Sequence, residues 1–160
     1  MTTGSYLCLN RLADARQIAN EAESKKLDSP FLRFGLYQLA FLENDSAGMS
    51  QQVEWGAGKA GVEDVLLAFE AATAAYYGRL AKAREFSLRA VEEGKRVGQK
   101  ETAAGYEAEA AIREALIGHA TQSRKWVNSA SPVPLGPRIQ TSNQDAFVVK
   151  LTESQQIIAQ

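Results

Sequence analysis

Apolar and small residues recur along this 160-residue chain at the three- and four-residue steps of an α-helix. The pattern predicts seven helices, with only a short helical stub before Asn10. Ser29 can cap one of these helices and Pro30 suits its first position. A joint containing glycines 56, 58 and 61 separates the third helix from the fourth. The predicted helices cover about residues 11–26, 29–43, 46–56, 63–77, 80–96, 100–117 and 120–130.

Four residues suited to ending a helix recur at regular spacing. They are Asn10, Asn44, Gly78 and Gly118, separated by 34, 34 and 40 positions. Glycine and asparagine tolerate the left-handed backbone conformation that closes a helix. We place the six additional residues of the last interval in the loop around Gly98.

Mostly small side chains lie five, nine and twelve residues after each of these turn residues. Offsets that differ by four and three trace one stripe along a helix. The sequence therefore predicts a stack of helical hairpins in which this stripe faces neighbouring helices. Its members are Ala15, Met49, Ala83, Ser123, Ala19, Val53, Ser87, Val127, Ala22, Gly56, Ala90 and Ala130.

The composition favours an all-α fold. About one residue in six is alanine, the best helix former, and no proline lies between Pro30 and Pro132. We predict helical repeats over 1–130 and a proline-rich linker over 131–143. Residues 144–160 are ambiguous, since Phe147 and Leu151 share a helical face whereas Phe-Val-Val favours a strand; we favour a helical cap.

The balance of charges and the absence of targeting signals argue against several classes of protein. Eighteen basic and nineteen acidic residues give a formal charge of −1, which argues against a broad nucleic-acid surface. No apolar run approaches the length of a membrane span, and the first residues lack the features of a secretory signal. Since Cys8 is the only cysteine, no intrachain disulfide can form. These features predict a cytoplasmic protein.

The candidate chemistry is sparse, and we expect no catalytic, cofactor-binding or metal-binding residue. His119, the only histidine, follows a turn glycine and is expected to be solvated, whereas Cys8 lies between leucines and is expected to be packed. The carboxylates are expected to form a solvated surface. Intrahelical ion pairs are expected to account for the basic residues of the helix over 80–96. The carboxylates concerned are Glu43, Asp45, Glu63, Asp64, Glu92, Glu93, Glu107, Glu109 and Glu114.

The 34-residue period and the run over 77–83, followed by Ala90, resemble the tetratricopeptide repeat (TPR). The resemblance extends over about residues 6–130 and implies a TPR-like right-handed superhelix of antiparallel helix hairpins. Residues 26–30, 52–55 and 74–80 further resemble repeat segments of bacterial regulatory proteins that carry kinase or winged-helix domains. The first repeat is truncated, which suggests either a fragment of a longer array or an array capped by residues 147–158.

The resemblance also implies a concave surface lined by the first helix of each hairpin, where peptides or partner helices bind. We therefore predict a protein- or peptide-binding module, a regulatory segment of a larger signalling protein. The alternative for the groove residues is that most pack between hairpins. Alternative functions are structural self-association through the open repeat ends or, with less weight, a small-ligand sensor or an enzyme. The candidate groove residues are Phe34, Gln38, Ala72, Tyr76, Ile112 and Leu116.

Overall fold

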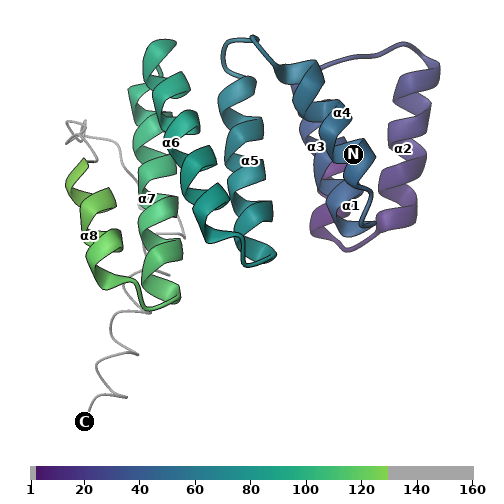
Figure 1. Ribbon diagram of the computed structural model, residues 1–160. Coiled ribbons are helices and arrows are strands. Elements are labelled where there is room, and N and C mark those ends of the chain that lie inside the picture. The colour runs from purple at the N-terminus through teal and green to yellow at the C-terminus, as the bar shows by residue number, and fades with distance from the viewer. Residues whose placement is uncertain (1–2, 130–160) are drawn as a thin grey trace, which may run out of the picture.

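A computed structural model describes residues 3–129, and in this range every regular element is a helix. The predicted all-α class is confirmed. Consecutive helices pair, and the pairs follow one another in a row from the purple end of the chain to the green end (Figure 1). The helices are α1 (Thr3–Cys8), α2 (Leu12–Ser24), α3 (Pro30–Leu42), α4 (Ser46–Gly56), α5 (Glu63–Tyr76), α6 (Leu80–Arg96), α7 (Lys100–Leu116) and α8 (Ala120–Ser129).

The four predicted turn residues all adopt the left-handed conformation. Their φ angles are 54° at Asn10, 58° at Asn44, 71° at Gly78 and 81° at Gly118. In each turn the following amide donates to the carbonyl five residues earlier; the bond from Arg79 to Ala74, for example, measures 2.8 Å. This bond satisfies a carbonyl that the end of the helix leaves free. One local motif therefore closes α1, α3, α5 and α7.

The position of the six additional residues differs from our prediction. The loop between α6 and α7 comprises only residues 97–99, whereas the loop between α4 and α5 comprises residues 57–62. The additional residues instead lengthen the helices, since α6 and α7 have 17 residues each, against 11 in α4 and 14 in α5. Gly98, at φ 80°, closes α6 with the same motif as the other turns and so allows a short loop.

The predicted stripe of small residues is largely buried. Ala15, Ala19 and Ala90 are fully buried, and Ala83 and Ser87 are nearly so. The stripe fails in α8, where Val127 is 60% exposed and its neighbour Trp126 is only 5% exposed. The large ring therefore defines the packed face of this short helix.

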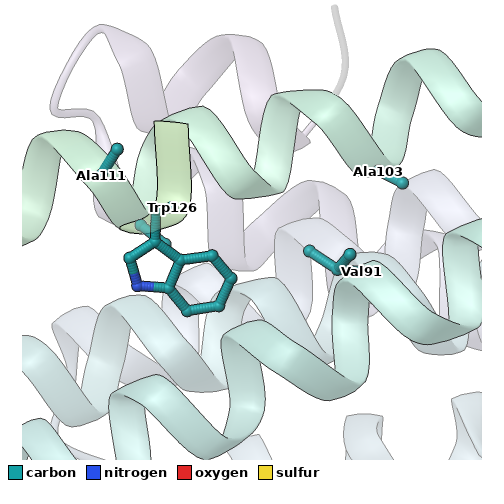
Figure 2. Close-up of a cluster of buried hydrophobic side chains, with 5 residues drawn as sticks. Val91, Ala103, Ala111 and Trp126 are labelled. Carbon is teal, nitrogen blue, oxygen red and sulfur yellow. The ribbon is translucent and has the colours of Figure 1, made fainter. Parts of the chain in front are cut away.

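Trp126 completes a core cluster formed by the last three helices. Figure 2 shows its indole beside Val91 of α6 and Ala111 of α7, and Ala103 belongs to the same cluster. Alanine side chains leave space between α7 and α8, and the indole fills it. The C-terminal core is therefore one large ring packed against small residues.

The core between the second and third hairpins has the opposite composition. Tyr37 and Leu66 are buried there, and the half-buried side chains around them include Phe34, Val53 and Phe69. Phe69 of α5 contacts both α3 rings, with centroid distances of 5.9 Å to Phe34 and 5.5 Å to Tyr37. Large side chains therefore fill the contact between the second and third hairpins.

Two expectations concern the ends of the chain. The stub expected before Asn10 is a six-residue helix, α1, which packs against α2 and α3. The predicted linker over 131–143 and the predicted helical cap over 144–160 lie outside the described residues.

Candidate functional site

An apolar groove with a volume of about 490 Å³ lies between α3, α5 and α7. We call it the α3–α5–α7 groove. The apolar residues of α5 that line it lie three or four positions apart, so one stripe of this helix forms the floor. Its lining includes Gln38 and Phe41 of α3; Val65, Ala68, Ala72 and Tyr76 of α5; and Tyr106 and Glu109 of α7.

Exposed aromatic rings stand at the end of the groove near the last turn of α5. Phe41 meets Tyr76 edge to face with a centroid distance of 5.2 Å, and Tyr77 lies 5.2 Å from Tyr76 in a similar arrangement. The Tyr76 side chain is nevertheless 74% exposed. An exposed ring held in place by two others offers contact area at a low cost in side-chain entropy.

A second apolar hollow, of about 590 Å³ between α1, α2 and α3, adjoins this groove. Gln38 and Phe69 line both, so the two hollows are adjacent. Phe31 lines the second hollow and is 83% exposed, while Phe34 lies half-buried between Phe31 and Phe69. The residues that line the two hollows therefore come from all four described hairpins.

A third hollow, of about 380 Å³, borders the same junction and is more polar than the other two; we call it the polar hollow. Tyr37 and Thr73 line both this polar hollow and the groove, and their hydroxyl oxygens lie 3.0 Å apart. This hydrogen-bonded pair separates the two. The polar hollow contains one acid, Glu70, and two cations, Arg79 and Lys82.

Two glutamates, Glu109 in the α3–α5–α7 groove and Glu70 in the polar hollow, lack ion-pair partners among the described residues; Glu70 is half-buried, whereas Glu109 is exposed. Removal of water by the surrounding chain raises the pKa of the Glu109 carboxyl, and the cation of Arg113 opposes this effect. Desolvation likewise raises the pKa of Glu70, opposed by Arg89 and Lys82. A carboxylate in such a position gains from pairing with a cation that a ligand supplies.

Other acidic residues are buried and paired, contrary to the expectation that the carboxylates form a solvated surface. Glu114 of α7 is 4% exposed and accepts two hydrogen bonds from Arg84 of α6, at 2.6 and 2.8 Å, and contacts His119 Nδ1 at 2.9 Å. These partners lower the pKa of Glu114, chiefly through the hydrogen bond from Arg84. Glu107, 2% exposed, accepts a 2.8 Å bond from Lys95.

Two of the basic residues of α6 therefore act between helices. Arg84 and Lys95 bind carboxylates of α7, while Arg96 forms the expected intrahelical pair with Glu93. Sequence spacing identified the intrahelical pair because its partners lie one turn apart. It could not identify the other two, whose partners are 30 and 12 positions distant.

Asp64 is a further buried acid, fully shielded from solvent near the start of α5. Its Oδ2 accepts a 2.9 Å hydrogen bond from the hydroxyl of Tyr106 on α7. Burial and this carboxylate together raise the pKa of Tyr106 well above its ordinary value, so the phenol stays protonated and donates. The bond fixes a ring that lines the groove.

The remaining candidates for chemistry are not assembled into a site. Cys8 is exposed, so the expectation of a packed thiol is wrong; it follows the last full turn of a six-residue helix. The side chain of His119 is 44% exposed but pairs with Glu114 rather than facing solvent alone. Within residues 3–129 no group of three or more His, Cys, Asp or Glu side chains is arranged to hold a metal ion.

The six predicted groove residues divide into two sets. Gln38, Ala72 and Tyr76 line the α3–α5–α7 groove, and Phe34 lines the adjoining hollow. Ile112 and Leu116 lie further along α7 and are not among the residues that line either hollow; Leu116 is 65% exposed.

Sequence reasoning missed several lining residues. Ala68 and Val65 lie one and two turns before Ala72 on the same stripe, and Phe41 lies one turn after Gln38. Extending each helical stripe would have found them. Tyr106 and Glu109 gave no such signal, because their place depends on how α7 sits against α5.

Comparison with known proteins adds no assignment: no family model, curated protein or solved structure matches this chain. Among the helices described, none is long and apolar enough to cross a membrane.

Proposed function

We propose that this chain is a TPR-like array of helical hairpins that binds a peptide segment of a partner protein in the α3–α5–α7 groove. The observation that carries the proposal is the groove itself, an apolar hollow of about 490 Å³ formed by the first helices of successive hairpins. Apolar grooves between helices accept peptides whose side chains fill them.

The array part of the proposal has separate support. The intervals of 34 residues separate turns of the same conformation, and the buried small residues recur in register with them. Such repetition is typical of helical repeat proteins. The resemblance to repeat segments of bacterial regulatory proteins supports a role as a regulatory segment of a signalling protein.

The exposure of the aromatic rings favours binding over simple packing between hairpins. Phe34 and Tyr37 contact Phe69 and hold the hairpins together, whereas Tyr76 leaves most of its surface in solvent. Packing between hairpins therefore accounts for Phe34 and Tyr37, but it leaves Tyr76 available to a partner.

Selection of ligands from a random peptide display library, followed by fluorescence polarisation with the selected peptides, tests the proposal. Ala72 is exposed on the groove floor, so Ala72→Arg fills the groove without disturbing the core. We expect this variant to weaken peptide binding by about tenfold or more, since it displaces the peptide from its contact surface. Ala81→Arg, at an exposed position of α6 outside the groove, is the matched control.

Peptides that bind both variants as tightly as the unmodified protein would place the binding surface elsewhere. Failure to select any peptide would contradict a peptide-binding function. Circular dichroism of both variants shows whether helical content is retained, so that loss of binding is not confused with loss of fold.

Self-association is the second candidate, and the end of the array carries an observation that favours it. Leu116, Ile117 and Val127 are 65%, 42% and 60% exposed, respectively. Large apolar side chains that are exposed to solvent are typical of interaction surfaces. Light scattering across a range of concentrations tests this, because a constant monomeric mass contradicts it.

A further inference from the structure

Among residues 3–129, the side chains that line the α3–α5–α7 groove include a single carboxylate and no positive charge. Glu109 is the only acidic residue among those lining it, and none of them is Lys, Arg or His. The nearest cation along α7 is Arg113, one turn away, whose guanidinium donates a 3.0 Å bond to Ser87 Oγ on α6. Within residues 3–129 no side chain forms an ion pair with Glu109.

The polar hollow on the other side of Tyr37 and Thr73 differs in this respect. Its acid, Glu70, shares the hollow with Arg79 and Lys82, so positive charge is already present there. Desolvation raises the pKa of both Glu70 and Glu109. Of these two glutamates, however, only Glu109 lies in a hollow whose described lining residues include no cation. A ligand that supplies a cation therefore complements the groove rather than the polar hollow.

We propose that the partner segment carries one lysine or arginine that pairs with Glu109, with apolar side chains that pack along α5 as far as Phe41 and Tyr76. This inference rests on the proposed peptide-binding function and specifies its ligand. Glu109 is exposed in the free protein, but a peptide that lies in the groove covers it on one side, so water screens the pair less in the complex. The phenol of Tyr106 is held by Asp64 at 2.9 Å and so does not compete for the carboxylate.

The dimensions of the groove suit a short extended segment. Val65 and Tyr76 line the groove at the two ends of α5, and the helical rise places them about 16 Å apart. An extended peptide covers this distance with about five residues. One segment can therefore place a basic side chain at Glu109 and an apolar side chain near Tyr76.

Matched peptide sets test the inference. One set consists of fluorescein-labelled heptapeptides of Leu, Phe and Ala with a single Lys placed at each position in turn; the other replaces Lys with norleucine. We expect the best Lys peptide to bind about tenfold more tightly than its norleucine counterpart. Glu109→Gln should reduce this preference to about twofold or less, since it removes the charge and keeps the shape.

Glu70→Gln is the matched control, because it neutralises the other desolvated glutamate at the same junction and should leave the Lys preference unchanged. Glu109→Lys should reverse the preference toward peptides that carry Glu in place of Lys. Circular dichroism of each variant checks that the helices persist, as expected for substitution of an exposed residue.

The outcomes separate this inference from the proposed function. If Lys and norleucine peptides bind the unmodified protein equally, the groove binds peptides but the inference about a basic residue is wrong. If Glu70→Gln removes the preference and Glu109→Gln does not, the cation binds in the polar hollow and the inference is again wrong. If neither set binds at all, both this inference and the peptide-binding groove are contradicted.

Discussion

The junction between α3 and α5 and the junction between α6 and α7 connect helices of the same array with side chains of opposite size. At the first, Phe34, Tyr37 and Phe41 of α3 meet the rings of α5. At the second, a Cβ placed on Gly94 of α6 would lie 3.4 Å from the Cβ of Ala103 of α7, so the two backbones approach closely.

The contrast explains where the hollows lie. The distance between packed helices depends on the side chains at their contact, and large rings hold helices further apart than alanines do. All three hollows described above include residues of α3. The hollows therefore lie at the aromatic junction, whereas the helices pack closely at the small-residue junction.

Charge follows the same division. Between α6 and α7 the buried Glu107 and Glu114 are paired with Lys95 and Arg84. Around the aromatic junction, Glu70 and Glu109 lie partly desolvated without an ion pair among the described residues. Paired charges fix one arrangement of two helices, while unpaired ones are available to a ligand.

The largest expected loss of stability follows from a substitution in the small-residue region around α7. Trp126→Ala should destabilise the protein by about 3–5 kcal/mol, because neighbouring alanines cannot fill the space that the indole leaves. Urea denaturation followed by circular dichroism measures the change in the free energy of unfolding. A loss below about 1 kcal/mol would mean that the indole is not part of the core that closes α6, α7 and α8.

Replacing Gly56 or Gly94 with alanine should change the stability of the protein in different directions. At Gly56 an added Cβ would lie 2.3 Å from Cδ1 of Leu66, a buried side chain, so Gly56→Ala should destabilise by about 1–3 kcal/mol. At Gly94 the nearest atom is 3.4 Å away, and Gly94→Ala should be neutral or stabilise by up to about 1 kcal/mol through helix propensity. Thermal unfolding of both variants measures the difference, and equal shifts would contradict the distinction.

The interhelical ion pair gives a prediction about pH. The pKa of Glu114 is lowered in the folded state from its ordinary value of 4.5, so the pair stabilises the fold above pH 4.5 and this contribution is lost as pH falls through the lowered pKa. Glu114→Gln should therefore be less stable than the unmodified protein at pH 7, with the difference narrowing toward acid pH. Denaturation midpoints at a series of pH values measure the gap; a gap that is constant with pH would contradict the assignment.

The smallest effects on stability are expected at the aromatic rings of the groove, where replacement of Tyr76 should cost less than replacement of Phe34. Tyr76→Ala should cost less than about 1 kcal/mol because the ring is 74% exposed, whereas Phe34→Ala should cost about 2 kcal/mol because its half-buried ring contacts Phe69. Peptide binding should respond in the opposite order, with the larger loss for Tyr76→Ala. A sharp loss of stability on replacing Tyr76 would place that ring in the core instead.

The sequence alone determined the helices and the turns between them. Helical periodicity, the capping residues Ser29 and Pro30, and the Asn and Gly residues of the turns act within a few positions of one another, so their effect can be inferred without knowing the rest of the fold. The resemblance to the tetratricopeptide repeat, combined with helical register, placed Gln38, Ala72 and Tyr76 among the groove residues, where the structure also has them, but Ile112 and Leu116 do not line the groove. Local reasoning failed at Val127, because only the packing of α8 against α7 decides whether that residue or Trp126 is buried.

The tertiary structure decided which charges are paired and which face a hollow. Arg84 and Glu114 are 30 positions apart, and Tyr106 and Asp64 are 42 apart, so nothing in the local sequence brings them together. Glu109 acquires its setting in the same way, from helices that are distant along the chain. Side-chain size at each helix contact sets how closely the helices approach, and that distance determines whether a carboxylate meets a partner within the protein or is left to meet one from a ligand.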